Sequence, residues 1–389
     1  MHIRVPRNST IPHGVETSSD LVVLSCEHKS PKQLGRTYEN KHENVPLKYI
    51  LWFVAIIGGV ELICLVMGCW YMYKNKGPGA TEKGYVIAAT GFKRFSHAEL
   101  KKATRNFSEV IGRGGGGVVY KGELPDERVV AVKWLEGVNQ GEEEFLAEVS
   151  IIGRINHMNL IQVWGFCAER KHRLLVYEYM EHGSLAENLS SNALDWEKRF
   201  EIAVGTAKGL AYLHEECLEW VLHCDIKPQN ILLDANYHPK VADFGLSKLR
   251  DRCGLPDFNI SRIRGTRGYM APEWILNQPI TSKVDVYSYG IVLLEMVTGR
   301  NSFGFSIDSE GDGKEFRNLV TWVRKMTCAA NGRPGRIEQI IDPKMDGTYD
   351  VVKMEILVKV ALQCVEEDKD ARPTMTQVVQ MLVRHEYDN

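Results

Sequence analysis

The sequence predicts an α+β protein with two lobes, the first rich in β-strands and the second helical, preceded by a single transmembrane helix. Three observations support this prediction. Residues 49–73 form a long apolar run, residues 107–180 contain strand-like Val-rich segments around a glycine-rich stretch, and residues 181–386 carry helix-like apolar spacing. Because 389 residues exceed one average domain, a two-lobed unit with a substantial core is expected.

Composition narrows the classes of protein that need to be considered. The hydrophobic content of 44% and the charged content of 25% are typical of a globular protein. The formal net charge of −2 gives no electrostatic case for binding nucleic acid. Only Cys26 precedes residue 50, and the six cysteines beyond the apolar run include no CxxC pair. This pattern argues against a zinc site and favours a reduced cytosolic domain.

The first 48 residues are polar and irregular, and we expect a short extracellular stub rather than a folded domain. Met1–Arg7 contains no apolar core of the signal-peptide type. Asn8-Ser9-Thr10 matches the acceptor pattern for N-glycosylation, which matters only if this end lies outside the cell.

Residues 49–73 are predicted to span a membrane. A helix of this length measures about 37 Å, which exceeds a hydrocarbon core of about 30 Å. Glu61, near the middle, costs about 3 kcal/mol on insertion, whereas the eleven Leu, Ile, Phe and Val residues return about 5 kcal/mol. A buried helix of a soluble protein is the alternative. Three basic residues flank each side of the run, so charge does not decide its orientation.

The segment 74–106 is interpreted as a juxtamembrane linker. Gly77-Pro78-Gly79 and scattered lysines predict an irregular start. Ser96 followed by Glu99 predicts a short helix that begins with a capping box.

A glycine-rich segment opens the β-rich lobe. Gly112, Gly114 and Gly117 are followed by Val119, and missing side chains let backbone N–H groups approach phosphates closely. By itself this pattern is weak and is also found in dinucleotide-binding folds. The strand-like Val130–Lys133 follows about fourteen residues later and favours a phosphate-binding lobe of another kind than the dinucleotide-binding fold.

Apolar spacing predicts the elements that follow. Phe145, Val149 and Ile152 recur at helical spacing and predict an amphipathic helix over residues 142–155. The predicted strand 173–180 ends before Gly183, where we place the lobe division. The predicted helices of the second lobe are 194–217, 319–326, 351–364 and 375–382.

Residues 223–230, His-Cys-Asp-Ile-Lys-Pro-Gln-Asn, bring three chemically useful groups into one loop. Asp225 is a carboxylate suited to orienting a hydroxyl and accepting its proton, and Lys227 is a cation suited to a transferred phosphoryl group. Asn230 supplies an oxygen that suits Mg²⁺, and Asp243 of Asp-Phe-Gly, thirteen residues later, adds a second. Each motif alone has a structural interpretation, a surface pair or a turn. The two motifs in this order, downstream of the glycine-rich segment, favour a catalytic role over a structural one.

This order and spacing resembles the catalytic loop and metal-binding triplet of protein kinases. Over residues 95–386 the chain resembles plant receptor-like serine/threonine kinases of the non-RD type, with Cys224 where an arginine is usual. The glycine-rich loop and residues 95–107 resemble most the group with an S-locus-type lectin ectodomain. The 48 residues before the apolar run are too few for that ectodomain, so we expect a truncated relative or a partial gene.

The resemblance implies a bilobal protein kinase domain over residues 107–386, with an N-lobe 107–180, a C-lobe 181–386 and Mg²⁺-ATP between them. Lys133, paired with Glu148, would align the phosphates, and Asn230 and Asp243 would hold the metal. Asp225 would accept the substrate's proton, and Lys227 is typical of serine/threonine kinases. The implied nucleotide-binding residues are Ile111, Gly112, Gly114, Gly117, Val119, Ala131, Lys133, the gatekeeper Tyr177, the hinge residues Glu178 and Met180, and Leu232.

Further roles follow from the same resemblance. Thr266 is expected to contact Asp225, and Ser261 is a candidate phosphorylation site. Two contacts are expected to be structural: a buried pair between Glu273 and Arg372, and a cap on the catalytic-loop backbone by Asp285.

These features predict a membrane-anchored kinase that transfers the γ-phosphate of ATP to protein Ser/Thr hydroxyls in receptor-type signalling. We expect the plasma membrane as its location and, because ATP is needed, a cytoplasmic kinase domain. Its expected partners are protein substrates, the lipid bilayer and other receptor kinases. Gly116, where an aromatic residue is usual, and Cys224 keep two alternatives open: a pseudokinase scaffold and a decoy.

Overall fold

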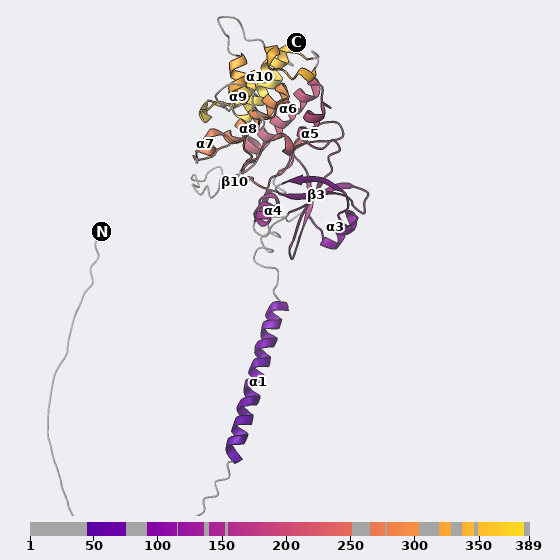
Figure 1. Ribbon diagram of the computed structural model, residues 1–389, viewed down its shortest axis with the longest axis vertical. Helices are drawn as coiled ribbons and strands as arrows, with labels where there is room; N and C mark the ends of the chain where they lie inside the picture. Colours follow the sequence, from indigo (N-terminus) through magenta and orange to yellow (C-terminus); the bar gives the residue numbers. More distant parts are fainter. Residues whose placement is uncertain are drawn as a thin grey trace, which may run out of the picture. The chain divides into compact units, whose positions relative to one another are not determined.

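The computed structural model describes residues 45–74, 92–114, 116–135, 140–151, 155–250, 265–276, 278–302, 319–327, 337–345 and 349–384. The chain divides into two compact units, Met1–Lys76 and Gly77–Asn389. In the first unit, helix α1 (Val45–Lys74) covers the whole predicted span. Its segment Leu47–Tyr71 is the one helical stretch among the described residues that is long and apolar enough to cross a membrane (Figure 1).

The second unit begins with a sheet-bearing N-lobe (Figure 1). Its six strands lie in the order β1-β5-β6-β4-β3-β2, and only the β1–β5 pair is parallel. Alternating Val residues explain the strands, since Val130 and Val132 of β4 are fully buried on one face. The strands are β1 (Lys93–Arg94), β2 (Val110–Gly114), β3 (Gly117–Glu123), β4 (Val129–Trp134), β5 (Val163–Glu169) and β6 (His172–Glu178).

Residues 92–106, placed by the sequence in the juxtamembrane segment, pack as part of this lobe. Helix α3 (His97–Ala103) begins with the expected capping box, in which Ser96 and Glu99 bond each other's backbone N–H groups. Phe95 and Leu100 are buried in the core beneath the sheet. Strand β1 approaches Gly165 so closely that a Cβ there would lie 2.1 Å from the carbonyl oxygen of Lys93. A glycine is therefore needed for this pairing.

Helix α4 (Gln140–Ile151) lies beside the sheet, where Phe145 and Val149 are buried as the periodicity predicted. Residues 152–154 of the predicted helix lie outside the described residues. The same helix buries Glu148, and this places a carboxylate inside the lobe.

The C-lobe is built around helix α8 (Lys283–Thr298), which is buried along almost its full length. The predicted helices around it are confirmed, and the one predicted to end at Cys217 closes with a π-helical turn, Tyr212–Glu216. The other helices are α5 (Leu185–Ser191), α6 (Trp196–Ala211), α7 (Pro272–Ile275), α9 (Leu319–Thr327), α10 (Val351–Cys364) and α11 (Met375–Val383).

Short elements between these helices carry the loops of the lobe. Strands β7 (Trp220–Leu222) and β10 (Lys248–Arg250) pair with each other, as do β8 (Ile231–Leu233) and β9 (Pro239–Val241). Short 3₁₀ turns are η2 (Pro228–Asn230), η3 (Ile337–Gln339), η4 (Pro343–Met345) and η5 (Lys369–Ala371).

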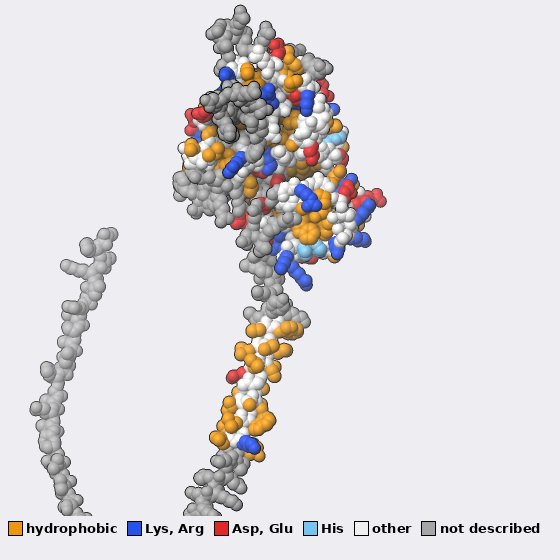
Figure 2. All heavy atoms as spheres, viewed as in Figure 1, with side chains coloured by type: hydrophobic (Ala, Val, Ile, Leu, Met, Phe, Trp, Pro, Cys, Tyr) orange, Lys and Arg blue, Asp and Glu red, His pale blue; other side chains and the backbone are white. Residues whose placement is uncertain are grey.

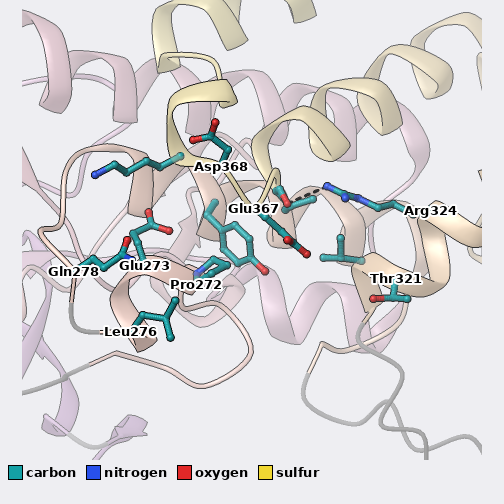
Figure 3. A pocket seen from close by; sticks show the side chains of 12 residues that line it. Pro272, Glu273, Leu276, Gln278, Thr321, Arg324, Glu367 and Asp368 are labelled. Atoms are coloured by element: carbon teal, nitrogen blue, oxygen red, sulfur yellow. Dashed lines mark hydrogen bonds between the residues drawn. The ribbon is translucent and has the colours of Figure 1, made fainter.

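The expected ion pair between Glu273 of α7 and Arg372 is confirmed. Two parallel bonds of 2.7 and 2.8 Å join the carboxylate and the guanidinium, and both side chains are almost fully buried. The pair lies beside a hollow of about 500 Å³ between α7, α9 and the turn after α10. At its rim, Arg324 donates to the carbonyl oxygen of Val365 at 3.2 Å (Figure 3). Thus α7 is fixed to the far end of the lobe.

We expect Glu273→Gln to lower the free energy of unfolding by about 3–5 kcal/mol, because Arg372 would keep its charge in a buried site without a counter-charge. The melting temperature should fall by roughly 10 °C. Glu366→Gln is the matched control, since Glu366 pairs with Arg324 at 3.1 Å on the half-exposed surface. Equal shifts in the two variants, measured by thermal denaturation, would contradict the assigned role.

Candidate active site

The loop 223–230 is held from below by Asp285 of α8. Its two carboxylate oxygens accept the backbone N–H groups of His223 and Cys224, each at 2.8 Å, and His214 contacts the same carboxylate at 2.9 Å. Burial alone would raise the pKa of Asp285, but these hydrogen bonds outweigh it and hold the pKa below its usual range. The predicted cap on the loop backbone is therefore confirmed, and it is a charged one.

Cys224 lies in a backbone conformation that side chains rarely adopt, with φ of +66°. Two bonds to Asp285 hold the peptide on either side of His223 and stabilise this conformation. The thiol is buried, and burial together with Asp285 raises its pKa well above the usual value. Cys224 is therefore a neutral core group and cannot supply the positive charge of the arginine it replaces.

Asp225 is the centre of a short hydrogen-bond network. Its carboxylate accepts from Thr266 Oγ1 at 2.7 Å and from Lys227 Nζ at 2.6 Å. Lys227 also donates to Thr266 Oγ1 at 2.9 Å, and Asn230 Nδ2 donates to Asp225 at 3.0 Å. The expected contact between Thr266 and Asp225 is confirmed. A carboxylate and a cation thus lie side by side in the loop. The candidate phosphorylation site Ser261 lies outside the described residues.

Lys133 of β4 lies between two carboxylates. Its Nζ is 2.8 Å from Glu148 Oε1 and 2.6 Å from Asp243 Oδ1. Burial would lower the pKa of Lys133, but the charges of the two carboxylates more than offset it and the pKa is raised. For the carboxylate of Asp243 burial has the opposite effect and would raise the pKa, but the charge of Lys133 holds this pKa below its usual range. Both groups are therefore charged at neutral pH.

The hydroxyl of Tyr177 donates to the second oxygen of Glu148. Glu148 is therefore held from two sides, by an ammonium and by a phenol, inside a lobe where it is almost fully buried. Burial and the neighbouring Glu148 raise the pKa of Tyr177, so the phenol stays a donor. Helix α4 is fixed in the position in which Glu148 reaches Lys133.

Asn230 and Asp243 fit a Mg²⁺ ion in their chemistry. Asp243 is an ionised carboxylate with φ of +68°, and Asn230 commits its amide nitrogen to Asp225, so its side-chain oxygen remains as a ligand atom. No cluster of three or more His, Cys, Asp or Glu side chains within the described part of the chain is arranged to hold a metal. Mg²⁺ commonly binds through one or two side chains plus water and phosphate, which this pair satisfies.

The expected nucleotide-binding residues lie on neighbouring strands and on one strand of the opposite lobe. Pairing places Ala131 opposite Tyr177, Val119 opposite Lys133 and Gly112 opposite Val119. Leu232 lies in β8 of the C-lobe. The hinge side chain of Glu178 is fixed by Lys240 at 2.9 Å and by the N–H of Gln162 at 2.7 Å.

The glycine-rich turn folds over Lys133. A Cβ at Gly116 would lie 3.4 Å from Lys133 Cε and 3.0 Å from a carboxylate oxygen of Glu144. A Cβ at Gly117, whose φ is +136°, would lie 2.0 Å from the carbonyl oxygen of Trp134. Gly117 is therefore required by the backbone itself, whereas a side chain at Gly116 would crowd the side chains of Glu144 and Lys133.

The protein kinase domain family matches residues 105–384. The chain belongs to this family. Among its curated relatives is a Zea mays protein named as a receptor protein kinase (ZmPK1), 46% identical and covering 96% of this chain and 48% of the relative. Two G-type lectin S-receptor-like serine/threonine-protein kinases of Arabidopsis thaliana, At1g34300 and SD2-2, are 44% and 41% identical. They cover 86% and 91% of this chain.

The chain spans less than half the length of these relatives, 48%, 41% and 44% in turn. Its kinase domain is of the receptor-like serine/threonine type, as the motifs predicted. The β-sheet N-lobe and helical C-lobe are likewise those of the family.

Three contributors to the kinase site were not predicted. The bonds from Tyr177 to Glu148, from Lys240 to Glu178 and from His214 to Asp285 join residues 29, 62 and 71 positions apart. No local motif marks Lys240 or His214, because each looks like an ordinary polar residue in a helix or strand. Their partners were recognisable, and only the fold reveals what fixes those partners.

We expect Asp285→Asn to lower phosphate transfer by at least about tenfold and stability by about 1.5–3 kcal/mol. The carboxylate of Asp285 accepts both N–H groups of the loop, whereas an asparagine has one oxygen. Its NH₂ group would therefore face one loop N–H group, which would lose its acceptor. The matched control is Asp234→Asn, because half-buried Asp234 also accepts two backbone N–H groups, those of Asn236 and His238. Activity and thermal melts of both variants test this, and an equally mild effect at both positions would contradict it.

Proposed function

We propose that this chain is a membrane-anchored kinase that transfers the γ-phosphate of ATP to Ser and Thr hydroxyls of proteins. The observation that carries the proposal is the arrangement around Asp225. Its carboxylate contacts Lys227 and Asn230 of the same loop, and Thr266 from a later segment. A base, a cation and a ligand oxygen within one short loop suit phosphoryl transfer better than a structural turn.

In the proposed reaction, Asp225 orients the substrate hydroxyl and accepts its proton. The hydroxyl oxygen forms a bond to the γ-phosphorus while the bond from that phosphorus to the β–γ bridging oxygen breaks, and ADP leaves with the electron pair. Lys227 is placed to stabilise charge on the transferred group, and Lys133 to bind the α- and β-phosphates. A Mg²⁺ ion held by Asn230 and Asp243 would neutralise phosphate charge.

The choice of Ser and Thr over Tyr rests on the same network. Lys227 and Thr266 both lie within hydrogen-bond distance of Asp225 and of each other, so both border the position at which a substrate hydroxyl would meet its carboxylate. The relatives named as serine/threonine kinases support the same choice.

Receptor-type signalling at the plasma membrane completes the proposal. The relatives' names describe receptor kinases, and helix α1 is long and apolar enough to cross a bilayer. We propose protein substrates and other receptor kinases as partners, with the kinase domain on the cytoplasmic side, where ATP is available.

We expect Lys133→Met and Asp225→Asn each to reduce phosphate transfer by at least about 10³-fold without unfolding the protein, because each removes one contact that positions or deprotonates the reactants. Incorporation of labelled phosphate, followed by phosphoamino-acid analysis, should detect phospho-Ser and phospho-Thr in the parent alone. Lys208→Met, at an exposed position of α6, is the control. Persistent transfer in both site variants, or none in a folded parent, would overturn the proposal.

The proposed orientation has its own test. In sealed microsomes that contain the full chain, protease added outside should digest residues 92–389, and Asn8 should carry a glycan that Asn8→Gln abolishes. Detergent-opened microsomes serve as the control for complete digestion. A kinase domain that is protected until detergent is added would contradict the orientation and leave the assignment of the catalytic residues untouched.

A further inference from the structure

One end of the N-lobe carries a concentration of positive charge. Residues 92–105 and 169–172 contain seven basic and two acidic side chains, a formal excess of five positive charges. The whole chain has a net charge of −2, so all other residues together carry −7. Six exposed members of this group, called the basic face below, are Lys93, Arg94, Lys101, Lys102, Arg170 and Lys171.

The fold joins these two sequence segments into one surface. Strand β1 pairs with β5, and α3 follows β1 directly. His97 at the start of α3 stacks on His172 at 3.9 Å between ring centroids, which places the helix against the turn at residues 170–171. Figure 2 shows Lys and Arg side chains around α3 with histidine beside them.

The two acidic side chains of this region are already engaged. Glu99 accepts the N–H and the hydroxyl of Ser96 at 2.7 and 2.8 Å in the capping box. Glu169 accepts the N–H of His97 at 3.0 Å. Their hydrogen bonds fix the start of α3 and do not extend to the lysines of its second half, Lys101 and Lys102. The exposed charges of Lys101, Lys102 and Lys171 are therefore left to solvent or to a partner.

The sequence keeps this face close to the membrane helix. Helix α1 ends at Lys74, and Phe92 is the first described residue of the kinase domain. The seventeen residues between them can extend at most about 60 Å. Lys93 follows immediately, so the basic face is the surface of the kinase domain that is nearest along the chain to the proposed span.

We propose that the basic face binds the anionic headgroups of the bilayer that holds α1. This inference rests on the membrane anchoring in the proposed function but not on catalysis. Each basic side chain at an anionic lipid surface favours binding by about fivefold, and the attraction acts within about 8 Å at physiological salt. The charges of the face are exposed, and a tether of at most about 60 Å allows the face to approach the bilayer to within that range.

The experiment uses the full chain in nanodiscs of neutral phosphatidylcholine or of phosphatidylcholine with about 30% phosphatidylserine. Amide hydrogen exchange should slow in residues 93–105 and 169–172 in the anionic discs only, and should recover when salt is raised from about 0.1 to about 0.5 M. Neutralising Lys101, Lys102 and Lys171 to Gln should weaken the bound state by about 100-fold and abolish the slowing. The matched control neutralises three exposed C-lobe lysines, Lys208, Lys344 and Lys359.

Slowing that depends on phosphatidylserine, is lost in the N-lobe variant and persists in the control establishes the proposal. Equal exchange in both discs overturns it. Protection spread over the C-lobe, or equal loss in the control variant, also overturns it. Phosphate transfer is measured in the same discs: an inactive chain with lipid-dependent protection defeats the proposed kinase activity alone, whereas a chain not retained by the discs defeats the anchoring and this inference with it.

Discussion

The active site depends on one buried carboxylate. Asp285 lies on the most deeply buried helix of the C-lobe and accepts two consecutive backbone N–H groups of the loop that carries Asp225, Lys227 and Asn230. Loop residues that act on a substrate need their backbone fixed, since an error of about 1 Å costs orders of magnitude in rate. A charged acceptor with three hydrogen bonds provides this, because leaving those N–H groups without a partner inside the core would cost several kcal/mol.

The N-lobe reaches this loop through charge as well as through apolar packing, since one buried cluster contains Phe145 and Val149 together with Phe244. Lys133 contacts Glu148 on one side and Asp243 on the other, so a single ammonium joins α4, the sheet and the segment after the catalytic loop. A buried carboxylate pair around one lysine is stable only when each group keeps its partner. Tyr177 adds a donor to Glu148 and reduces the dependence of that carboxylate on Lys133. A change in the position of α4 would therefore also change the charges around Lys133, because Glu148 is carried by that helix.

Most of the catalytic constellation was predictable because phosphate and metal chemistry demand particular groups at short spacing. Asp225, Lys227 and Asn230 share one loop, and their identities alone restrict what the loop can do. Helix positions such as 351–364 were predictable from apolar periodicity, which matches α10 at both ends. The long-range partners Lys240 and His214 were not predictable, because nothing local in the sequence distinguishes them. Likewise Ser96 and Glu99 predicted a helix start, but the docking of that helix on the sheet needed Gly165, whose role is visible only when β1 lies against it.

The replacement of the usual arginine by Cys224 changes how the segment after Asp243 is held in its described part. The thiol is buried and neutral, so it offers no cation to a phosphate. Residues 265–276 are instead fixed by hydrogen bonds that need no phosphorylation. Thr266 bonds Asp225, Tyr269 donates to Glu295 at 3.0 Å, and Ser288 donates to the carbonyl of Tyr269 at 2.8 Å. Burial raises the pKa of Glu295, and its carboxyl group accepts the hydroxyl of Tyr269. The position of the described residues 265–276 therefore rests on contacts with the C-lobe itself.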